Sequence, residues 1–153
     1  MKIYVETTIP SYLVSRHSRD IIVLAHQQIT EEWWEEKRKQ FDLYVSTVVL
    51  DEISAGDKTL AKKRYDLIKG IPSLELMPDT EKLARIYLKE LNLPNKALRD
   101  SLHIAMAVGH EMDYILTWNC AHIANEQIRR KLQEINSKIG KKTPLICTPE
   151  ELI

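Results

Sequence analysis

Three carboxylates and one side-chain amide follow predicted strands or lie near the start of predicted helices: Glu6, Glu52, Asp100 and Asn119. All four side chains offer oxygen ligands, which suit a hard divalent cation such as Mg²⁺ or Mn²⁺ better than zinc. In open α/β sheets, ligands bind beyond the carboxyl ends of the strands. We therefore expect these residues, although far apart in sequence, to meet at one edge of a sheet and hold a divalent metal.

The elements that must position them alternate between short apolar runs and longer amphipathic segments. Predicted strands lie within residues 2–8 and at 43–46, 74–77, 114–117 and 145–147. Predicted helices cover 10–13, 20–40 (one helix or two in tandem), 48–53, 60–68, 80–91, 96–110 (capped by Asn95) and 124–139. Strands that alternate with helices favour a three-layer α/β/α fold with a mainly parallel sheet of about five strands. At 153 residues, we expect a single domain spanning 1–153.

Composition sets limits on the protein's class and partners. Lys plus Arg and Asp plus Glu both total 22, so no overall positive charge advertises nucleic-acid binding, and any polyanion must be held locally. Cys120 and Cys147 form no Cys-x-x-Cys pair, which argues against a zinc knuckle or a disulfide framework. No apolar stretch approaches the ~20 residues that cross a bilayer. We expect a cytoplasmic protein with no membrane partner.

Several residues have both a functional and a structural interpretation. His103 lies one turn after Asp100 on the predicted 96–110 helix, and a packed or hydrogen-bonded core residue is the favoured role for it over a catalytic base. Trp33 and Trp34 are expected to cover the core. Base stacking or a subunit interface is the alternative, with Trp34 taken as the exposed member. Cys120 and His122 adjoin Asn119 without ligand spacing, so a structural role is expected.

The four polar positions also carry a family resemblance. Their contexts are Val5-Glu6-Thr7-Thr8, Val49-Leu50-Asp51-Glu52, Asp100-Ser101-Leu102-His103-Ile104-Ala105 and Ile115-Leu116-Thr117-Trp118-Asn119. In order and context they resemble the PIN-domain ribonucleases of the VapC-like toxin type, along the whole chain. Two positions depart from that pattern, because Glu6 stands where the family usually has Asp and Asn119 where it usually has an acid.

The resemblance implies a PIN-like fold and a metal-dependent ribonuclease that uses Mg²⁺ or Mn²⁺. Glu6, Glu52 and Asp100 would be the catalytic carboxylates and, with Asn119, the metal ligands. Thr7, Thr8 and Thr117 would orient those ligands or a water, and Arg99 would contact phosphate. Turn and cap roles for the threonines, and a solvated surface role for Arg99, are the alternatives. The implied partners are an RNA substrate, an antitoxin protein and a second copy in a homodimer.

Two further functions compete with the ribonuclease. Glu6 and Asn119 motivate a catalytically weakened or inactive protein that acts as an RNA- or partner-binding module. A phosphatase that forms an aspartyl phosphate is disfavoured, because that chemistry needs a nucleophilic Asp after the first strand, where Glu6 stands.

Overall fold

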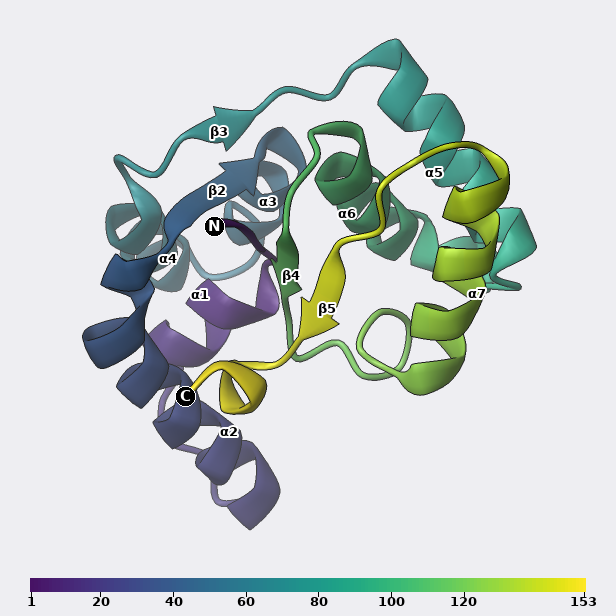
Figure 1. The fold of residues 1–153 in the computed structure, drawn as a ribbon. Helices are drawn as coiled ribbons and strands as arrows, with labels where there is room; N and C mark the ends of the chain where they lie inside the picture. Colours follow the sequence, from purple (N-terminus) through teal and green to yellow (C-terminus); the bar gives the residue numbers. More distant parts are fainter.

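The computed structural model describes all residues, 1–153, around one five-stranded sheet (Figure 1). The strands are β1 (Lys2–Val5), β2 (Asp42–Ser46), β3 (Ser73–Leu74), β4 (Tyr114–Leu116) and β5 (Leu145–Cys147). Their order is β3-β2-β1-β4-β5, and every neighbouring pair is parallel. Strand β1 is central because it is the most completely apolar run: Ile3, Tyr4 and Val5 have no exposed surface.

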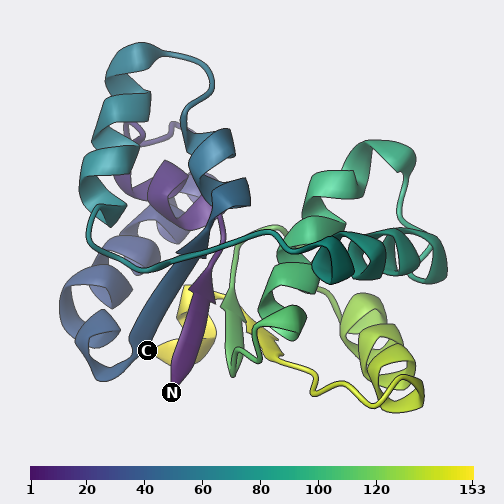
Figure 2. The same ribbon diagram turned by 90° about the horizontal axis from the view of Figure 1, so that it is seen from above.

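Helices cover both faces of the sheet. They are α1 (Thr8–Val14), α2 (Ile21–Glu32), α3 (Thr47–Ile53), α4 (Lys58–Ile68), α5 (Pro78–Glu90), α6 (Leu98–Gly109) and α7 (Glu126–Lys138). Figure 2 shows α1 to α4 on one side and α5 to α7 on the other. The predicted three-layer, parallel α/β/α fold is therefore confirmed. None of the helices is long and apolar enough to cross a bilayer.

Helix α6 is buried on nearly every side along residues 104–108. Ile104, Ala105, Met106, Ala107 and Val108 are all at most 1% exposed. This helix packs against α5 and approaches the carboxyl end of α3, so its polar residues are carried into the interior with it. A buried polar side chain must find a partner, and the site described below supplies partners for those of α6.

Several element boundaries differ from the predictions. Helix α1 begins at Thr8, two residues before Pro10, which is tolerated in the first turn because its missing amide hydrogen has no helical partner there. Strand β3 is only Ser73–Leu74, not 74–77, because it is an edge strand and Pro78 already begins α5. Asn95 does not cap α6. It begins a 3₁₀ turn (Asn95–Ala97), and Ala97 precedes the helix without a side-chain cap.

The predicted helix over 20–40 is a tandem of different helix types. Asp20 caps α2, and the chain continues as a π-helical segment (Trp33–Lys37) and a 3₁₀ turn (Arg38–Gln40). Trp33 is fully buried and Trp34 is 6% exposed, with the Arg38 guanidinium 4.6 Å above its ring. Covering the core is therefore their role. The expectation of an exposed Trp34 was wrong, because the widened π turn directs both rings inward.

Candidate metal centre

Glu6 stands at the topological switch point of the sheet. It directly follows β1, whose neighbours β2 and β4 lie on opposite sides, and its amide donates to the Leu116 carbonyl of β4 (3.0 Å). This crevice is where parallel sheets bind ligands. The Glu6 side chain is only 4% exposed. A buried carboxylate at this position needs compensation from its surroundings.

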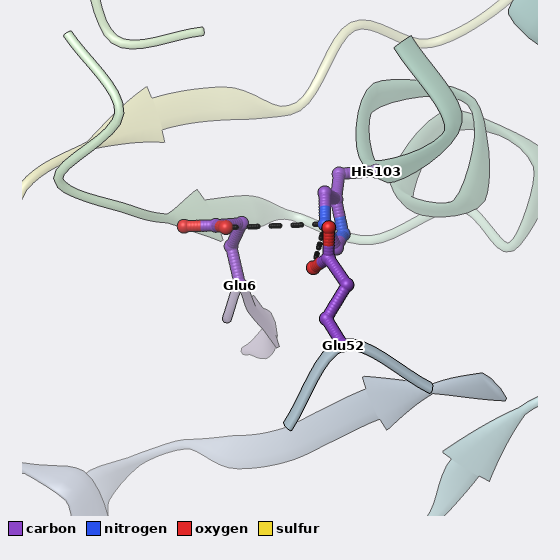
Figure 3. Close-up of side chains that lie close together, drawn as sticks. All are labelled: Glu6, Glu52 and His103. Atoms are coloured by element: carbon purple, nitrogen blue, oxygen red, sulfur yellow. Dashed lines mark hydrogen bonds and ion pairs between the residues drawn. The ribbon is translucent and has the colours of Figure 1, made fainter. Parts of the chain in front are cut away.

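Three hydrogen bonds hold one oxygen of Glu6. Its Oε2 accepts from the Thr8 amide (3.1 Å), the Thr8 hydroxyl (2.5 Å) and the Thr117 hydroxyl (2.6 Å). The other oxygen, Oε1, faces His103, with 3.8 Å between Oε1 and Nε2 (Figure 3). One oxygen is thus fixed by Thr8 of α1 and by Thr117, which follows β4, and the second is directed into the space between the strand ends.

Glu52 approaches this space from α3. Ser46 at the end of β2 caps that helix by accepting from the Val49 amide (3.3 Å), which starts α3 immediately after the strand. Glu52 Oε2 accepts from the Thr7 hydroxyl and lies 2.8 Å from His103 Nε2. Burial favours the neutral acid, but the hydrogen bond and charge of His103 and the Thr7 hydroxyl outweigh it and lower the pKa of Glu52. Glu52 is therefore ionised at neutral pH.

His103 of α6 joins the two carboxylates. It is 1% exposed, and its Nδ1 lies 2.7 Å from the Tyr4 hydroxyl, which lies 2.7 Å from Ser46 Oγ. Burial acts to lower the pKa of His103, but the hydrogen bond to Glu52 and the charges of Glu6, Glu52 and Asp100 together raise it above its ordinary value of 6.5. The hydrogen-bonded core role expected for this residue matches its contacts. Its Nε2 also points between the two carboxylates.

Glu6, Glu52 and His103 together form a group with the dimensions of a metal site. One ligand atom from each residue lies within 4.8 Å of the other two (Figure 3). A divalent ion bound at about 2.1 Å brings neighbouring ligand atoms about 3 Å apart. His103 Nε2 lies 2.8 Å from Glu52 Oε2 and 3.8 Å from Glu6 Oε1, so Glu6 would move closer when an ion binds. Two carboxylates and an imidazole are donors that first-row divalent ions accept. The group fits a divalent cation with little rearrangement.

Asp100 and Asn119 form a second group with His122. Asp100 Oδ1 accepts from Asn119 Nδ2 (2.8 Å), and Asp100 Oδ2 lies 2.7 Å from His122 Nδ1. The side-chain oxygen of Asn119, Oδ1, accepts from the His122 amide (3.1 Å), so the three residues are mutually bonded. The Asp100 and His122 side chains are 21% and 28% exposed. Asp100 and Asn119 are predicted ligands that lie outside the three-residue group, although the charge of Asp100 reaches His103.

The remaining predicted residues surround these groups. Thr8 and Thr117 donate to Glu6, and Thr7 donates to Glu52. Arg99 is exposed, and its positive charge contributes to the lowered pKa of Glu52. The Thr8 and Thr117 hydroxyls also accept from the amides of Trp118 (2.9 Å) and Asn119 (2.9 Å), so the same hydroxyls fix both the carboxylate and the chain after β4.

Sequence reasoning missed two kinds of residue here. Tyr4 was predicted only as a strand residue and Ser46 as the end of a strand that could cap the next helix, and nothing local in the sequence connects either of them to His103. His122 was expected to be structural because it lacks ligand spacing from Cys120, but it is the partner of Asp100. Its position three residues after Asn119 was the available signal, because a loop that turns after a strand can bring i and i+3 together.

Comparison with known proteins bears on the fold. No protein-family model and no curated protein matches the sequence. Among solved structures, the chain is similar to a chain of VapBC2 from Rickettsia felis, which was crystallised bound to a DNA fragment from its promoter. The TM-score is 0.56, with 14% sequence identity over 97% of this chain and 98% of the other.

The fold is PIN-like. The likeness spans both chains almost end to end, and it confirms the predicted resemblance to VapC-like PIN proteins at the level of the fold. At 14% identity it carries no residue roles across. What the site does must therefore be argued from its own contacts.

Proposed function

We propose that this PIN-like protein is a divalent-metal-dependent endoribonuclease of the toxin–antitoxin type. The observation that carries the proposal is the meeting of Glu6, Glu52 and His103 at the switch point of the sheet, with one ligand atom of each within 4.8 Å of the others. Buried carboxylates directed at one point are costly unless a cation or a proton balances them. A divalent ion that also binds substrate phosphate would account for the arrangement.

The proposed ion is Mg²⁺ or Mn²⁺, held by Glu6 and Glu52. His103 lies beside them, and Asp100 and Asn119 would be the further ligands. When bound, such an ion lowers the pKa of a water and polarises a phosphoryl oxygen. The chain's own residues supply the geometry. Thr8 and Thr117 hold Glu6, Thr7 holds Glu52, and Tyr4 fixes the orientation of the His103 ring.

Residues on the exposed side of the site, which we call its mouth, would bind the substrate. Arg99 is exposed and within electrostatic reach of Glu52, which places a positive charge where an RNA phosphate would approach the carboxylates. Asp100 would contribute through its charge, or by exchanging its bond to Asn119 for one to the ion. Glu6, Glu52 and Asp100 remain the proposed catalytic carboxylates.

A cleavage assay tests this function. The protein is incubated with a mixture of structured and single-stranded RNA in Mn²⁺, in Mg²⁺ and in EDTA, and the products are resolved by size. We expect cleavage with the ions and none in EDTA, and Glu6→Gln should remove the activity while leaving the protein folded. If the wild type cuts no RNA, or the Glu6→Gln preparation cuts equally well, the activity does not belong to this site.

A second candidate is a PIN-like module that binds RNA or a protein partner without turnover. It is favoured by the internal partners of the acids: His103 already lies between Glu6 and Glu52, and both oxygens of Asp100 are occupied. Calorimetric titration with Mn²⁺ separates the two candidates. Absence of a binding heat, in a folded protein at neutral pH, would favour the binding module.

The proposed partners are an antitoxin protein and a second copy of the chain. We propose that the chain forms a single domain and that the protein acts in the cytoplasm. The support for an antitoxin is the fold shared with VapBC2. A light-scattering mass of one chain would contradict the homodimer. Co-purification with the product of a neighbouring reading frame would support the antitoxin.

A further inference from the structure

A cluster of three aromatic rings lies beside the candidate metal centre. Tyr12 of α1, His26 of α2 and Trp118, which follows β4, have nearly parallel planes, with angles of 15° to 24° between them. The His26 and Trp118 centroids are 4.0 Å apart, and Tyr12 lies 6.3 Å from each. Trp118 is 7% exposed, and its Nε1 donates to Thr30 Oγ1 (2.7 Å). Burial and this hydrogen bond therefore fix the Trp118 ring, against which the other two rings stack.

Two hydrogen bonds connect this cluster to Glu6. The Trp118 amide donates to Thr8 Oγ1 (2.9 Å), and the same hydroxyl donates to Glu6 Oε2 (2.5 Å). Tyr12 is half-buried. Tyr12 lies one turn after Thr8 on α1, and burial, followed by the charges of Cys120 and Glu6, raises the pKa of its hydroxyl. The ring and the hydroxyl that binds Glu6 therefore lie on consecutive turns of one helix.

A basic loop continues from the same helix. Arg16, His17 and Arg19 are exposed between α1 and α2. The loop is held by Gln27, which is 2% exposed: its side chain accepts from the Ser18 amide (2.9 Å) and donates to the Arg16 carbonyl (3.0 Å). Because Gln27 is buried and its side chain bonds to the loop backbone, it fixes the backbone from which Arg16 and Arg19 project.

We propose that Tyr12 stacks on a base of single-stranded RNA and that Arg16 and Arg19 contact phosphates of the same strand. This inference rests on the proposed function and names the form of its substrate. A protein with zero net charge must hold a polyanion locally, and here an aromatic ring on α1 is followed by exposed arginines on the loop that leaves the same helix. In a duplex, the bases stack on one another and cannot reach a side-chain ring, so the substrate is single-stranded.

Binding of fluorescein-labelled oligonucleotides in EDTA tests the proposal, because no cutting occurs without metal. The probes are a ten-nucleotide single-stranded RNA and the same backbone with abasic residues at its centre. Tyr12→Ala should weaken binding of the intact RNA about tenfold, the usual effect of losing one stacking contact, and leave the abasic probe unchanged. Tyr12→Phe should bind as the wild type does, because it keeps the ring.

The arginines are tested by salt dependence. Arg16→Gln and Arg19→Gln should each reduce the slope of log K against log salt by about 0.7, the value for one phosphate contact on a single strand. Arg130→Gln, a matched change of an exposed arginine on α7, should leave the slope unchanged. If Tyr12→Ala does not fold, as judged by thermal unfolding, Tyr12→Leu replaces it, since leucine keeps the bulk without the ring.

The outcomes separate this inference from the proposed function. If RNA is cut in Mn²⁺ but the Tyr12 variants bind both probes as the wild type does, the stacking proposal is overturned and the nuclease stands. If stacking-dependent binding is found without cleavage, the reverse holds. A wild type that binds neither probe overturns the stacking proposal, while the cleavage assay in Mn²⁺ decides the nuclease. Equal weakening on the intact and abasic probes shows that Tyr12 acts only through packing.

Discussion

The two carboxylate–histidine groups differ in burial more than in chemistry. The Glu52 and His103 side chains pair at 2.8 Å and are 21% and 1% exposed, whereas the Asp100 and His122 side chains pair at 2.7 Å and are 21% and 28% exposed, so the difference lies in the burial of the histidine. The first pair is tied through Tyr4 and Ser46 to two strands, whereas the second is tied only to the loop after β4. The same contact thus involves a fully buried histidine in one place and a partly exposed histidine in the other.

This difference indicates how the site is built. A buried pair costs desolvation, and it persists because its partners are over-determined by the strands. A pair at the mouth gains less from each bond but can exchange partners with little loss. We infer that the inner group, Glu6, Glu52 and His103, fixes where an ion or a phosphate binds. The outer group, Asp100, Asn119 and His122, adjusts to what is bound.

The largest expected difference between the groups is in stability. His103→Ala should cost about 3–5 kcal/mol in EDTA, because it removes the charge partner that the buried Glu6 and the partly exposed Glu52 share. His122→Ala should cost about 1 kcal/mol or less, because its pair is partly solvated. Urea unfolding at pH 6 measures both. Equal losses would mean that burial does not distinguish the two groups.

Activity should depend on the inner group first. Glu6→Gln keeps the shape of the side chain and removes its charge, so Mn²⁺ affinity and RNA cleavage should fall at least about 100-fold, the upper range for the loss of even an outer-shell partner. Asn119→Ala, which alters the outer group, should lower Mn²⁺ affinity and RNA cleavage by less than about tenfold. Calorimetry with Mn²⁺ and initial cleavage rates provide the two measurements. A larger effect from Asn119→Ala would make the outer group the metal site.

Replacing Asn119 by an acid should make the stability of the protein more dependent on metal. In Asn119→Asp the donor to Asp100 is replaced by a second negative charge, so stability in EDTA should fall by about 1–2 kcal/mol, the cost of an unsatisfied polar group. Mn²⁺ should then recover that loss, because the added carboxylate supplies a ligand. Thermal unfolding with and without Mn²⁺ gives the comparison. A variant that is destabilised equally in both conditions would contradict a metal between Asp100 and residue 119.

The sequence allowed the sheet, the order of its elements and the edge where the polar residues meet to be predicted, because these follow from apolar periodicity and from the geometry of parallel strands. Glu6 and Glu52 are brought together by those rules alone. The direction of His103 could not be predicted in the same way. It depends on how α6 rotates against α5 and on a hydroxyl from β1, which are tertiary contacts with no local signal. The Asp100–His122 pair was missed because it is set by a loop conformation.

The mildest test is pH, applied without metal. The raised pKa of His103 means that its ion pair stabilises the protein fully below the ordinary value of 6.5, and that this contribution is lost as pH rises through the higher folded value. The lowered pKa of Glu52 means that its contribution is present above the ordinary 4.5 and is lost as pH falls through the lower folded value. Stability in EDTA should therefore be highest between about pH 4.5 and 6.5 and decline above that range, with the upper decline absent in His103→Gln. His122→Gln should retain the decline. If both variants retain it, the buried pair is not its source, and the contrast between the two groups would have to rest on unfolding and cleavage data alone.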